Sequence, residues 1–218
     1  MSKIWFTSDV HFGHKSILKF CPKTRLGEDV SKHVERLHND TTHPDYKKRH
    51  EIHQEYVRQM DKLLIERWNE TVADDDTIYC LGDFSFYKAG KTESILRQLS
   101  GRKILIKGNH DHWIDDSTSK YFESIHDYLK IIIDKKHVVL FHYPIAEWDR
   151  AHHGGYHLYG HVHGNLQLEG RAMDVGIDTR PTGDMKPWSW EEIDEILCKK
   201  EIIKHHGKTK SETEDDAV

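Results

Sequence analysis

The stretch GNHDH, residues 108–112, follows a short β-prone run, Lys103–Ile106, and places an amide beside two imidazoles and a carboxylate. A strand that ends at a glycine and is followed by polar side chains is typical of a loop at the edge of a sheet. Asn109 is unusual for a plain turn and unusual for a metal site, where His, Cys, Asp and Glu are the common ligands. Its meaning depends on the other histidine-bearing stretches of the chain.

Four other stretches resemble this one, because each puts Asp or His directly after a predicted strand. They are Asp9-Val10-His11, Gly82-Asp83, His142 and Gly160-His161-Val162-His163. In open α/β sheets, ligands bind in the crevice beyond the carboxyl ends of the strands. We therefore expect all five stretches to meet at one edge, where the glycines permit tight turns and close backbone approach.

Short strands alternate with helices around these stretches. Strands are predicted at Lys3–Thr7, Thr77–Leu81, Lys103–Ile106, Tyr128–Ile133, His137–Phe141, Tyr156–Tyr159 and Ala172–Val175. Helices are predicted at Glu51–Trp68, at Thr92–Leu99 and after the capping box of Ser189 and Glu192. This order predicts an α/β layered fold with mixed sheets in one domain, residues 1–204. A helical insertion is expected around 30–68, and the polar tail 205–218 is expected to be disordered.

Composition limits the class of protein. The 218 residues suit one domain with a real core. Lys and Arg number 32 against 37 Asp and Glu, and the net charge of -5 argues against bulk binding to nucleic acid or an anionic membrane. The start of the chain has no apolar signal-peptide core, and no run of apolar residues could span a bilayer, so a cytoplasmic protein is expected. Cys21, Cys80 and Cys198 form no CxxC pair, so reduced thiols are expected.

The polar side chains divide into two metal sites that share one carboxylate. One site would use Asp9, His11, Asp83 and His163, and the other Asp83, Asn109, His142 and His161. Mixed imidazole and oxygen donors without thiolate favour two divalent ions, with Mn²⁺ expected and Fe, Zn, Ni, Co or Mg as alternatives. Because the set contains only two carboxylates, the neutral amide of Asn109 would leave positive charge to attract a phosphate.

Two such ions about 3.5–4 Å apart can lower the pKa of a shared water and aim it as hydroxide at phosphorus. A leaving alkoxide then needs a proton, and His110, next to Asn109 but assigned to no metal, is the expected general acid. Asp111 is a candidate for orienting His110. His14, one helical turn beyond His11, is a candidate for substrate contact, with a helix-capping or solvent-facing role as the alternative.

The blocks DVH, GD, GNHD, H and GHVH, in this order between residues 9 and 163, resemble the signature of the calcineurin-like metallophosphoesterase superfamily. DVHFGH, GDF, FHYP and DVGID further resemble its small single-domain prokaryotic and phage members, although segment 30–55 is longer than in that pattern. The resemblance implies a two-sheet sandwich flanked by helices, a dinuclear metal centre and hydrolysis of phosphomonoesters or phosphodiesters. It assigns the seven ligands named above, and His110 as the acid.

The chain is thus predicted to be a metal-dependent phosphoester hydrolase with a slight preference for phosphodiesters, such as cyclic nucleotides. That preference rests on His110, which can protonate a poor alkoxide leaving group. A phosphomonoesterase or protein phosphatase, a nucleotide pyrophosphatase, a nuclease and a non-catalytic scaffold stay open as alternatives. Asp174 and Asp178 are expected to be turn carboxylates, and the histidines of the insertion are expected to form a solvated face.

Overall fold

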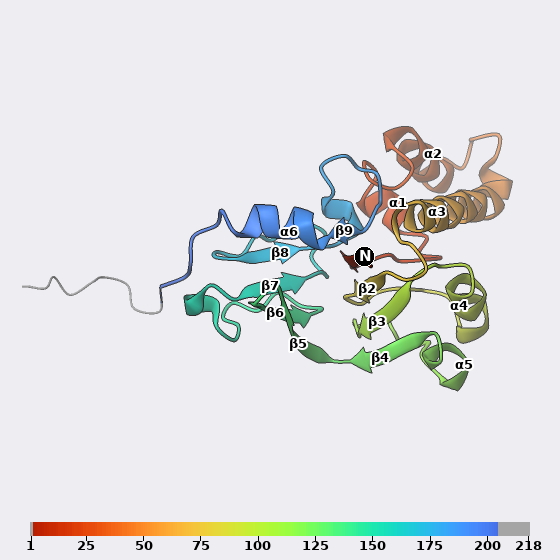
Figure 1. The fold of residues 1–218 in the computed structure, drawn as a ribbon. Helices are drawn as coiled ribbons and strands as arrows, with labels where there is room; N and C mark the ends of the chain where they lie inside the picture. Colours follow the sequence, from red (N-terminus) through yellow and green to blue (C-terminus); the bar gives the residue numbers. More distant parts are fainter. Residues whose placement is uncertain (1, 205–218) are drawn as a thin grey trace, which may run out of the picture.

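The computed structural model, which describes residues 2–204, contains two β-sheets (Figure 1). The first has the order β4-β3-β2-β1-β9 and consists of β1 (Ile4–Thr7), β2 (Thr77–Cys80), β3 (Arg102–Ile106), β4 (Phe122–His126) and β9 (Trp188–Ser189). The second has the order β5-β6-β7-β8 and consists of β5 (Tyr128–Ile133), β6 (Lys136–Phe141), β7 (Tyr156–Tyr159) and β8 (Ala172–Asp174). Both sheets are mixed, because the β1–β9 and β5–β6 pairs are antiparallel and the other pairs are parallel.

Alternating side chains of the first sheet divide the core into two layers. Trp5 faces the helices, whereas Phe6 joins Ile106 and, from the second sheet, Leu140 and Leu158 in one buried cluster. Helix α6 (Trp190–Leu197) packs its buried face into the same cluster. The two sheets therefore share an apolar interior, which confirms the predicted α/β layered fold of two mixed sheets flanked by helices.

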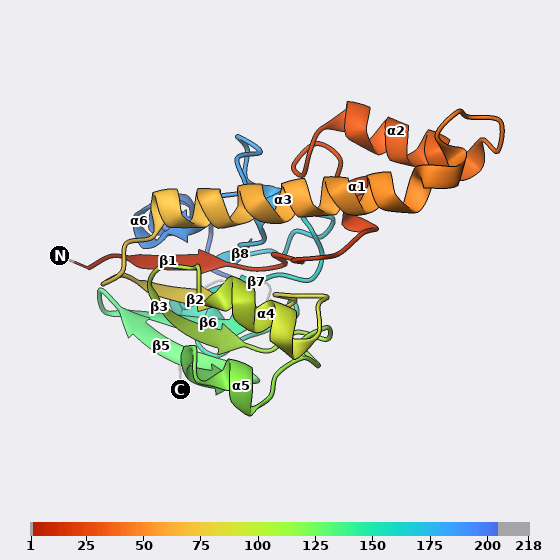
Figure 2. The same cartoon turned by 90° about the vertical axis from the view of Figure 1, so that its right-hand side faces the viewer.

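Two helices cover the outer face of the first sheet (Figure 2). They are α3 (Arg49–Thr71) and α4 (Ala89–Leu96), which confirm two of the three predicted helices, with α4 beginning and ending three residues earlier than expected. Val57, Met60 and Leu64 share one face of α3 and pack on the sheet. Helix α2 (Glu28–Asn39) and the first turns of α3 extend beyond the sheet, within the region 30–68 where the sequence predicts a helical insertion.

The remaining elements are short. They are α1 (Ile17–Phe20), η1 (Tyr46–Lys48), α5 (Asp116–Ser119), η2 (Ala151–His153) and η3 (Ile177–Thr179). Cys21, Cys80 and Cys198 are free thiols, as expected. Among residues 2–204, none of the helices has both the length and the apolar sequence that crossing a bilayer requires. The tail predicted to be disordered, 205–218, lies outside the described residues.

Candidate metal centre

Loops at the carboxyl ends of five strands bring together the side chains predicted as ligands. Asp9 and His11 follow β1, Asp83 follows β2, Asn109 follows β3, His142 follows β6, and His161 and His163 follow β7. Hydrogen bonds join the loops, since the N–H groups of Asp9 and His11 donate to the carbonyls of Gly82 and Asp83 at 3.0 Å. The two sheets also meet here, where Ser8 forms a bridge with Gly176. Both sheets therefore contribute donors to one edge of the molecule.

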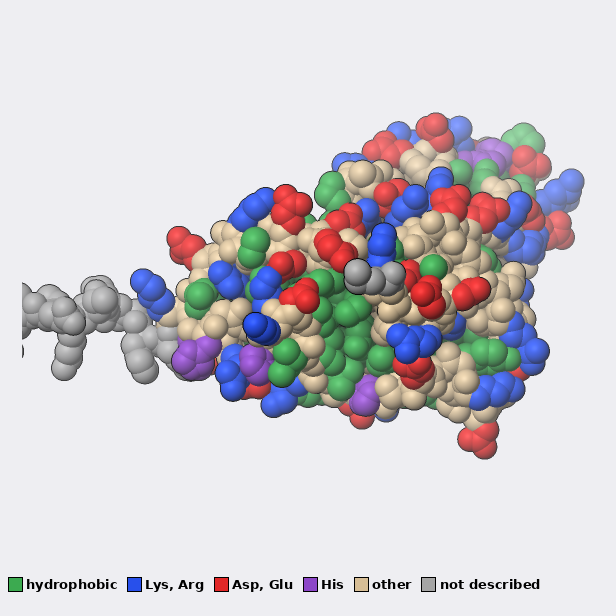
Figure 3. Space-filling view, viewed as in Figure 1, with side chains coloured by type: hydrophobic (Ala, Val, Ile, Leu, Met, Phe, Trp, Pro, Cys, Tyr) green, Lys and Arg blue, Asp and Glu red, His purple; other side chains and the backbone are tan. Residues whose placement is uncertain are grey.

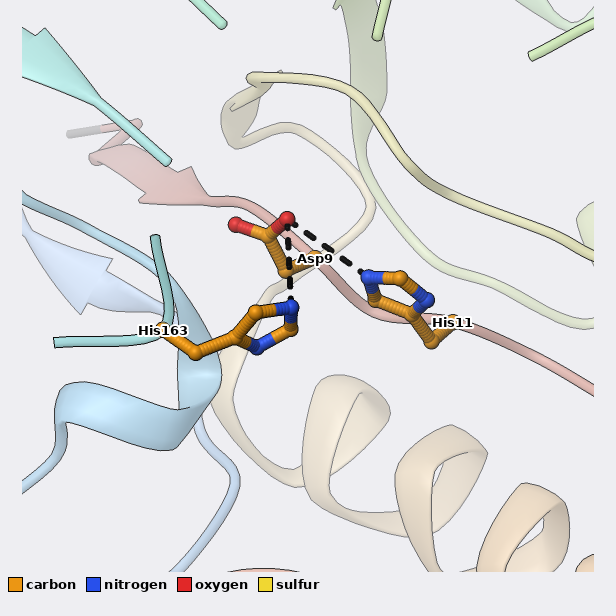
Figure 4. A group of neighbouring side chains, drawn as sticks. All are labelled: Asp9, His11 and His163. Atoms are coloured by element: carbon orange, nitrogen blue, oxygen red, sulfur yellow. Dashed lines mark ion pairs between the residues drawn. The ribbon is translucent and has the colours of Figure 1, made fainter. Parts of the chain in front are cut away.

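Asp9, His11 and His163 form the first cluster (Figure 4). Nε2 of His11 lies 3.5 Å from Oδ1 of Asp9, and Nε2 of His163 lies 3.9 Å from the same oxygen. Nε2 of His11 also lies 3.8 Å from Oδ2 of Asp83. The Asp83 carboxylate thus stands between this cluster and the next, at the position expected of a shared ligand.

Asp83, His142 and His161 form the second cluster, with Asn109 beside it. Nδ1 of His142 lies 2.7 Å from the carbonyl oxygen of Leu81. Because a carbonyl can only accept, Nδ1 carries the proton and Nε2 presents a lone pair. That Nε2 faces Oδ2 of Asp83 at 3.6 Å and Oδ1 of Asn109 at 3.2 Å. Lone pairs that converge in this way are stabilised by a cation.

Buried polar atoms that form no hydrogen bond indicate a cation in the first cluster too. Within residues 2–204, Oδ1 of Asp9 and Nε2 of His11 are buried and form no hydrogen bond, although they face each other at 3.5 Å. Each such group costs on the order of 1–3 kcal/mol if it stays unsatisfied. The complete donor set comprises two carboxylates, one amide and four imidazoles. A set of this kind fits divalent transition metals.

Backbone strain coincides with these positions. Five of the seven side chains belong to residues with left-handed φ, namely Asp9 at 54°, His11 at 56°, Asp83 at 52°, His161 at 72° and His163 at 47°. A non-glycine residue in this region costs on the order of 1–3 kcal/mol, and such residues persist where the surrounding structure holds them. Strain concentrated at polar, converging side chains is characteristic of functional sites.

Two glycines let the loops approach the carboxylates closely. A Cβ at Gly160 would overlap the side chains of Ser8 and Asp9. A Cβ at Gly108 would overlap the Asp83 carboxylate. The glycines that precede His161 and Asn109 are therefore required by space.

His163 is held by Asp178, and Thr24 and Arg25 hold Asp178 in turn; the sequence singled out none of the three as functional. Its Nδ1 lies 2.8 Å from Oδ2 of Asp178, and Thr24 donates a hydrogen bond to the other oxygen. The buried Arg25 donates to Asp178 at 2.7 Å and to the carbonyl of Asp9 at 2.8 Å. Burial raises the pKa of Asp178, but Arg25 and then His163 outweigh it and hold that pKa below its usual range. Asp178, expected to be a turn carboxylate, therefore orients a candidate ligand.

Asp111 supports the loop of Asp83. Its carboxylate accepts hydrogen bonds from the backbone N–H groups of Asp83, Phe84 and Gly108 and from the indole of Trp113. Within residues 2–204, the carboxylate of Asp111 forms no hydrogen bond with the imidazole of His110, which it was expected to orient. Asp111 thus fixes the backbone that carries a candidate ligand.

His110 and His14 lie on the rim of the centre, against Phe86. His110 is exposed, its backbone N–H donates to Oδ1 of Asp83 at 2.9 Å, and its ring centroid lies 4.5 Å from that of Phe86. His14 stacks on Phe86 at 3.8 Å, and its Nδ1 lies 3.0 Å from Nδ1 of His11. The expected helical turn between His11 and His14 is wrong, because His14 lies in the loop before α1. Its ring supports that of His11.

Comparison with known proteins supports the fold but supplies no function. No family model matches the chain. An uncharacterised protein of Methanocaldococcus jannaschii is 25% identical over 213 residues, which cover 94% of this chain and 96% of the relative. The gene 66 proteins of Mycobacterium phages L5 and D29 are 26% and 28% identical, over 82% of this chain and 87% and 89% of theirs.

Among solved structures, a protein of unknown function from Aquifex aeolicus has a TM-score of 0.58 and 25% identity, over 90% of this chain and 100% of that chain. The E. coli phosphoesterase Yfce has a TM-score of 0.35 and 13% identity, over 80% of this chain and 78% of that one, a likeness too low to support a statement about function. Function must therefore be argued from the site.

Proposed function

We propose that the protein is a metal-dependent phosphoesterase with two divalent ions, Mn²⁺ being the first expectation. Asp9, His11, Asp83 and His163 would hold one ion, and Asp83, Asn109, His142 and His161 the other. The observation that carries the proposal is the convergence of donor atoms at one edge, above all the unpartnered Oδ1 of Asp9 and Nε2 of His11. When bound, such a pair of ions supplies an activated water and neutralises charge on the phosphoryl oxygens.

His110 would move the proton that the leaving group needs. Its ring is exposed on the rim, while the bond from its backbone to Asp83 fixes its distance from the centre. Packing against Phe86 limits the orientations of the ring. An imidazole in this position can protonate a leaving oxygen. Asn109 contributes an oxygen without a charge, so the centre attracts a phosphate more strongly than a third carboxylate would allow.

A preference for phosphodiesters, of the nucleotide type, follows from this role of His110. Turnover of bis-p-nitrophenyl phosphate and of p-nitrophenyl phosphate, each with added Mn²⁺, Fe²⁺, Zn²⁺, Ni²⁺, Co²⁺ or Mg²⁺, tests it. Greater turnover of the diester is expected. Mainly monoesterase activity would overturn the preference, and no turnover of either ester with any metal would overturn the assignment as a phosphoesterase.

A second candidate, hydrolysis of a nucleic-acid strand, is favoured by one feature beside the centre. Lys15, Arg58 and Lys91 line a cavity of about 250 Å³ together with Gly13, two positions beyond His11. Arg58 and Lys91 also line a cavity of about 440 Å³ between α3 and α4. Cations along such a groove suit phosphates beyond the scissile one, although Asp61 and Glu66 also line the larger cavity and Arg58 is paired with Glu55 at 2.6 Å. Hydrolysis of single-stranded DNA that weakens steeply with added salt would favour this candidate.

A further inference from the structure

Helices α2 and α3 bring three histidines of the insertion together. His38 lies near the end of α2, and His50 and His53 lie in the first turns of α3. The ring centroid of His38 lies 5.2 Å from that of His53 and 5.7 Å from that of His50. The sequence predicts a solvated face here. It does not reveal the pairing of these histidines, because they meet only when the two helices fold back on each other.

The hydrogen bonds of His53 determine which of its nitrogens has the lone pair. Its Nε2 lies 3.0 Å from the carbonyl oxygen of Lys15, which can only accept, so Nε2 carries the proton. Its Nδ1 is therefore unprotonated, and it faces Nε2 of His38 at 3.1 Å. Histidines that bind metals almost always donate their other N–H to a carboxylate, a backbone carbonyl or water, and His53 has this arrangement.

We propose that His38 and His53 bind a divalent transition-metal ion such as Zn²⁺. This site is separate from the candidate centre at the strand ends, and it does not depend on the proposed function. Without metal, Nε2–H of His38 donates to Nδ1 of His53. On binding, the proton of His38 moves to its Nδ1, and both lone pairs bind the ion without net release of a proton. Tetrahedral Zn–N bonds of about 2.0–2.1 Å place two nitrogens about 3.3 Å apart, close to the present spacing.

The surroundings favour neutral rings, which are the form that binds metal. Partial burial, followed by the neighbouring His53 and His50, lowers the pKa of His38, and burial also lowers the pKa of His53. Arg49 is a nearby positive charge that opposes a cation. Glu35 and Lys19 both line the cavity of about 250 Å³ that contains His38 and His53, and they form an ion pair at 4.0 Å, so the charge of Glu35 is largely balanced by Lys19.

A metal at this site would connect the insertion to the candidate centre. Lys15, which accepts the hydrogen bond from His53, follows His14, and the ring of His14 contacts His11. An ion held by His38 and His53 would therefore tighten α2 and α3 against the loop that supports a candidate ligand. The expected consequence is a more rigid insertion.

Histidine-ring NMR of the full chain tests the site directly. In long-range ¹H–¹⁵N spectra, added Zn²⁺ should shift the resonances of His38 and His53 and move the proton of His38 from Nε2 to Nδ1. His38→Gln and His53→Gln should each weaken Zn²⁺ binding at this site by roughly tenfold or more. His153→Gln, at an exposed histidine of η2, is the control and should leave the binding unchanged.

Unshifted His38 and His53 resonances at a tenfold excess of Zn²⁺ would overturn the proposal, as would an equal loss of binding in His153→Gln. The titration of the unsubstituted protein decides the matter even if a variant does not fold. His11, His142, His161 and His163 give resonances of their own, so the two sites are distinguished. An absence of phosphoester turnover would overturn the proposed function and leave this result standing.

Discussion

At the scale of single residues, the candidate ligands combine strained backbone with unpaired donor atoms. Asp9, His11 and Asp83 have left-handed φ, and hydrogen bonds between their loops hold them there. Asp and His tolerate this region better than most residues do. The strain and the missing partners both point to a structure that is completed by a ligand.

Removal of the proposed acid should slow the chemistry and leave the metal. His110→Ala is expected to lower turnover of a phosphodiester by about 10²–10⁴-fold, because no other group is assigned to protonate the leaving oxygen. Metal content, measured by elemental analysis, should stay the same. His112→Ala, at an exposed neighbour, is the matched control. Unchanged turnover in His110→Ala would remove this residue from the mechanism.

Loss of the Asp178 charge should affect both the metal and the fold. Asp178→Asn keeps the size of the side chain but removes the charge that balances the buried Arg25, and it leaves one acceptor oxygen where the carboxylate offers two. Metal affinity is expected to fall about 10–100-fold, and the free energy of unfolding by roughly 3–5 kcal/mol. Calorimetric metal titration and urea unfolding measure the two effects. Asp184→Asn, at a partly exposed carboxylate paired with Arg180, should change neither by a comparable amount.

The sequence predicted the candidate ligands at strand ends, and the structure has them there, because the parallel strands of both sheets bring their carboxyl ends to one edge. It did not indicate Arg25 and Asp178, which are 153 positions apart and meet only in the folded chain. The same reason hides the pair of His38 and His53. A polar residue whose partner is distant in sequence has no local pattern to mark it.

At the scale of elements, helices and strands with a strong local sequence pattern were predicted, and those with a weak pattern were not. The hairpin of β5 and β6 is confirmed, and its two-residue turn has positive φ at Asp134 and Lys135, as a type I′ turn requires. The bounds of α2, within the expected helical insertion, were not predicted, because only Val34 and Leu37 are buried along its twelve residues. Strand β4 was missed because it is an edge strand with Phe122 as its one fully buried residue.

The start of α6 offers a direct test of a local prediction. Ser189 accepts a hydrogen bond from the N–H of Glu192, and the carboxylate of Glu192 accepts one from the N–H of Ser189. Ser189→Ala should lower the free energy of unfolding by about 1 kcal/mol, since the N–H of Glu192 loses its acceptor and the Glu192 carboxylate loses the hydroxyl of Ser189. Urea unfolding measures the change. Glu191→Ala, at the exposed neighbour, should stay within about 0.5 kcal/mol, and an equal loss in both would contradict the role of the cap.

At the scale of the whole molecule, charge is dispersed and apolar side chains are concentrated. On the face shown in Figure 3, Lys and Arg intermingle with Asp and Glu, while apolar side chains gather in the middle, between the two sheets. No broad patch of one sign occurs on that face among the described residues. This distribution agrees with the small net charge of -5.

Stability should decline in mild acid because of a buried histidine in the second sheet. His157 accepts a hydrogen bond from Ile145, its other ring nitrogen contacts the carbonyl of Val139, and burial lowers its pKa from 6.5 to about 4. At a pH between these two values, His157 binds a proton in the unfolded chain and stays neutral in the folded chain. The contribution of His157 to the free energy of unfolding is fully present above pH 6.5. It is lost, by about 3 kcal/mol, as the pH drops towards 4. Urea unfolding across this range should show a shallower decline for His157→Gln, and equal declines would assign the effect to other groups.

Chelation should lower the thermal stability of the protein. Ions at 100 times their dissociation constant stabilise the folded state by about 2.7 kcal/mol. Calorimetry with and without EDTA should therefore show a lower Tm for the stripped protein, and an unchanged Tm would contradict metal binding to the folded state. Asp178→Asn should show a smaller difference.

The donors come from the strand ends of both sheets, and this has a consequence for the life of the protein. Ions bound between the strand ends of the two sheets would link the sheets to each other as well as serve the reaction. The metal-free protein would lose this link between the sheets along with its activity, and it would unfold locally most readily at the loops that carry the ligands. Proteases would find such a chain first, so metal supply would govern how long the protein survives as well as how fast it works.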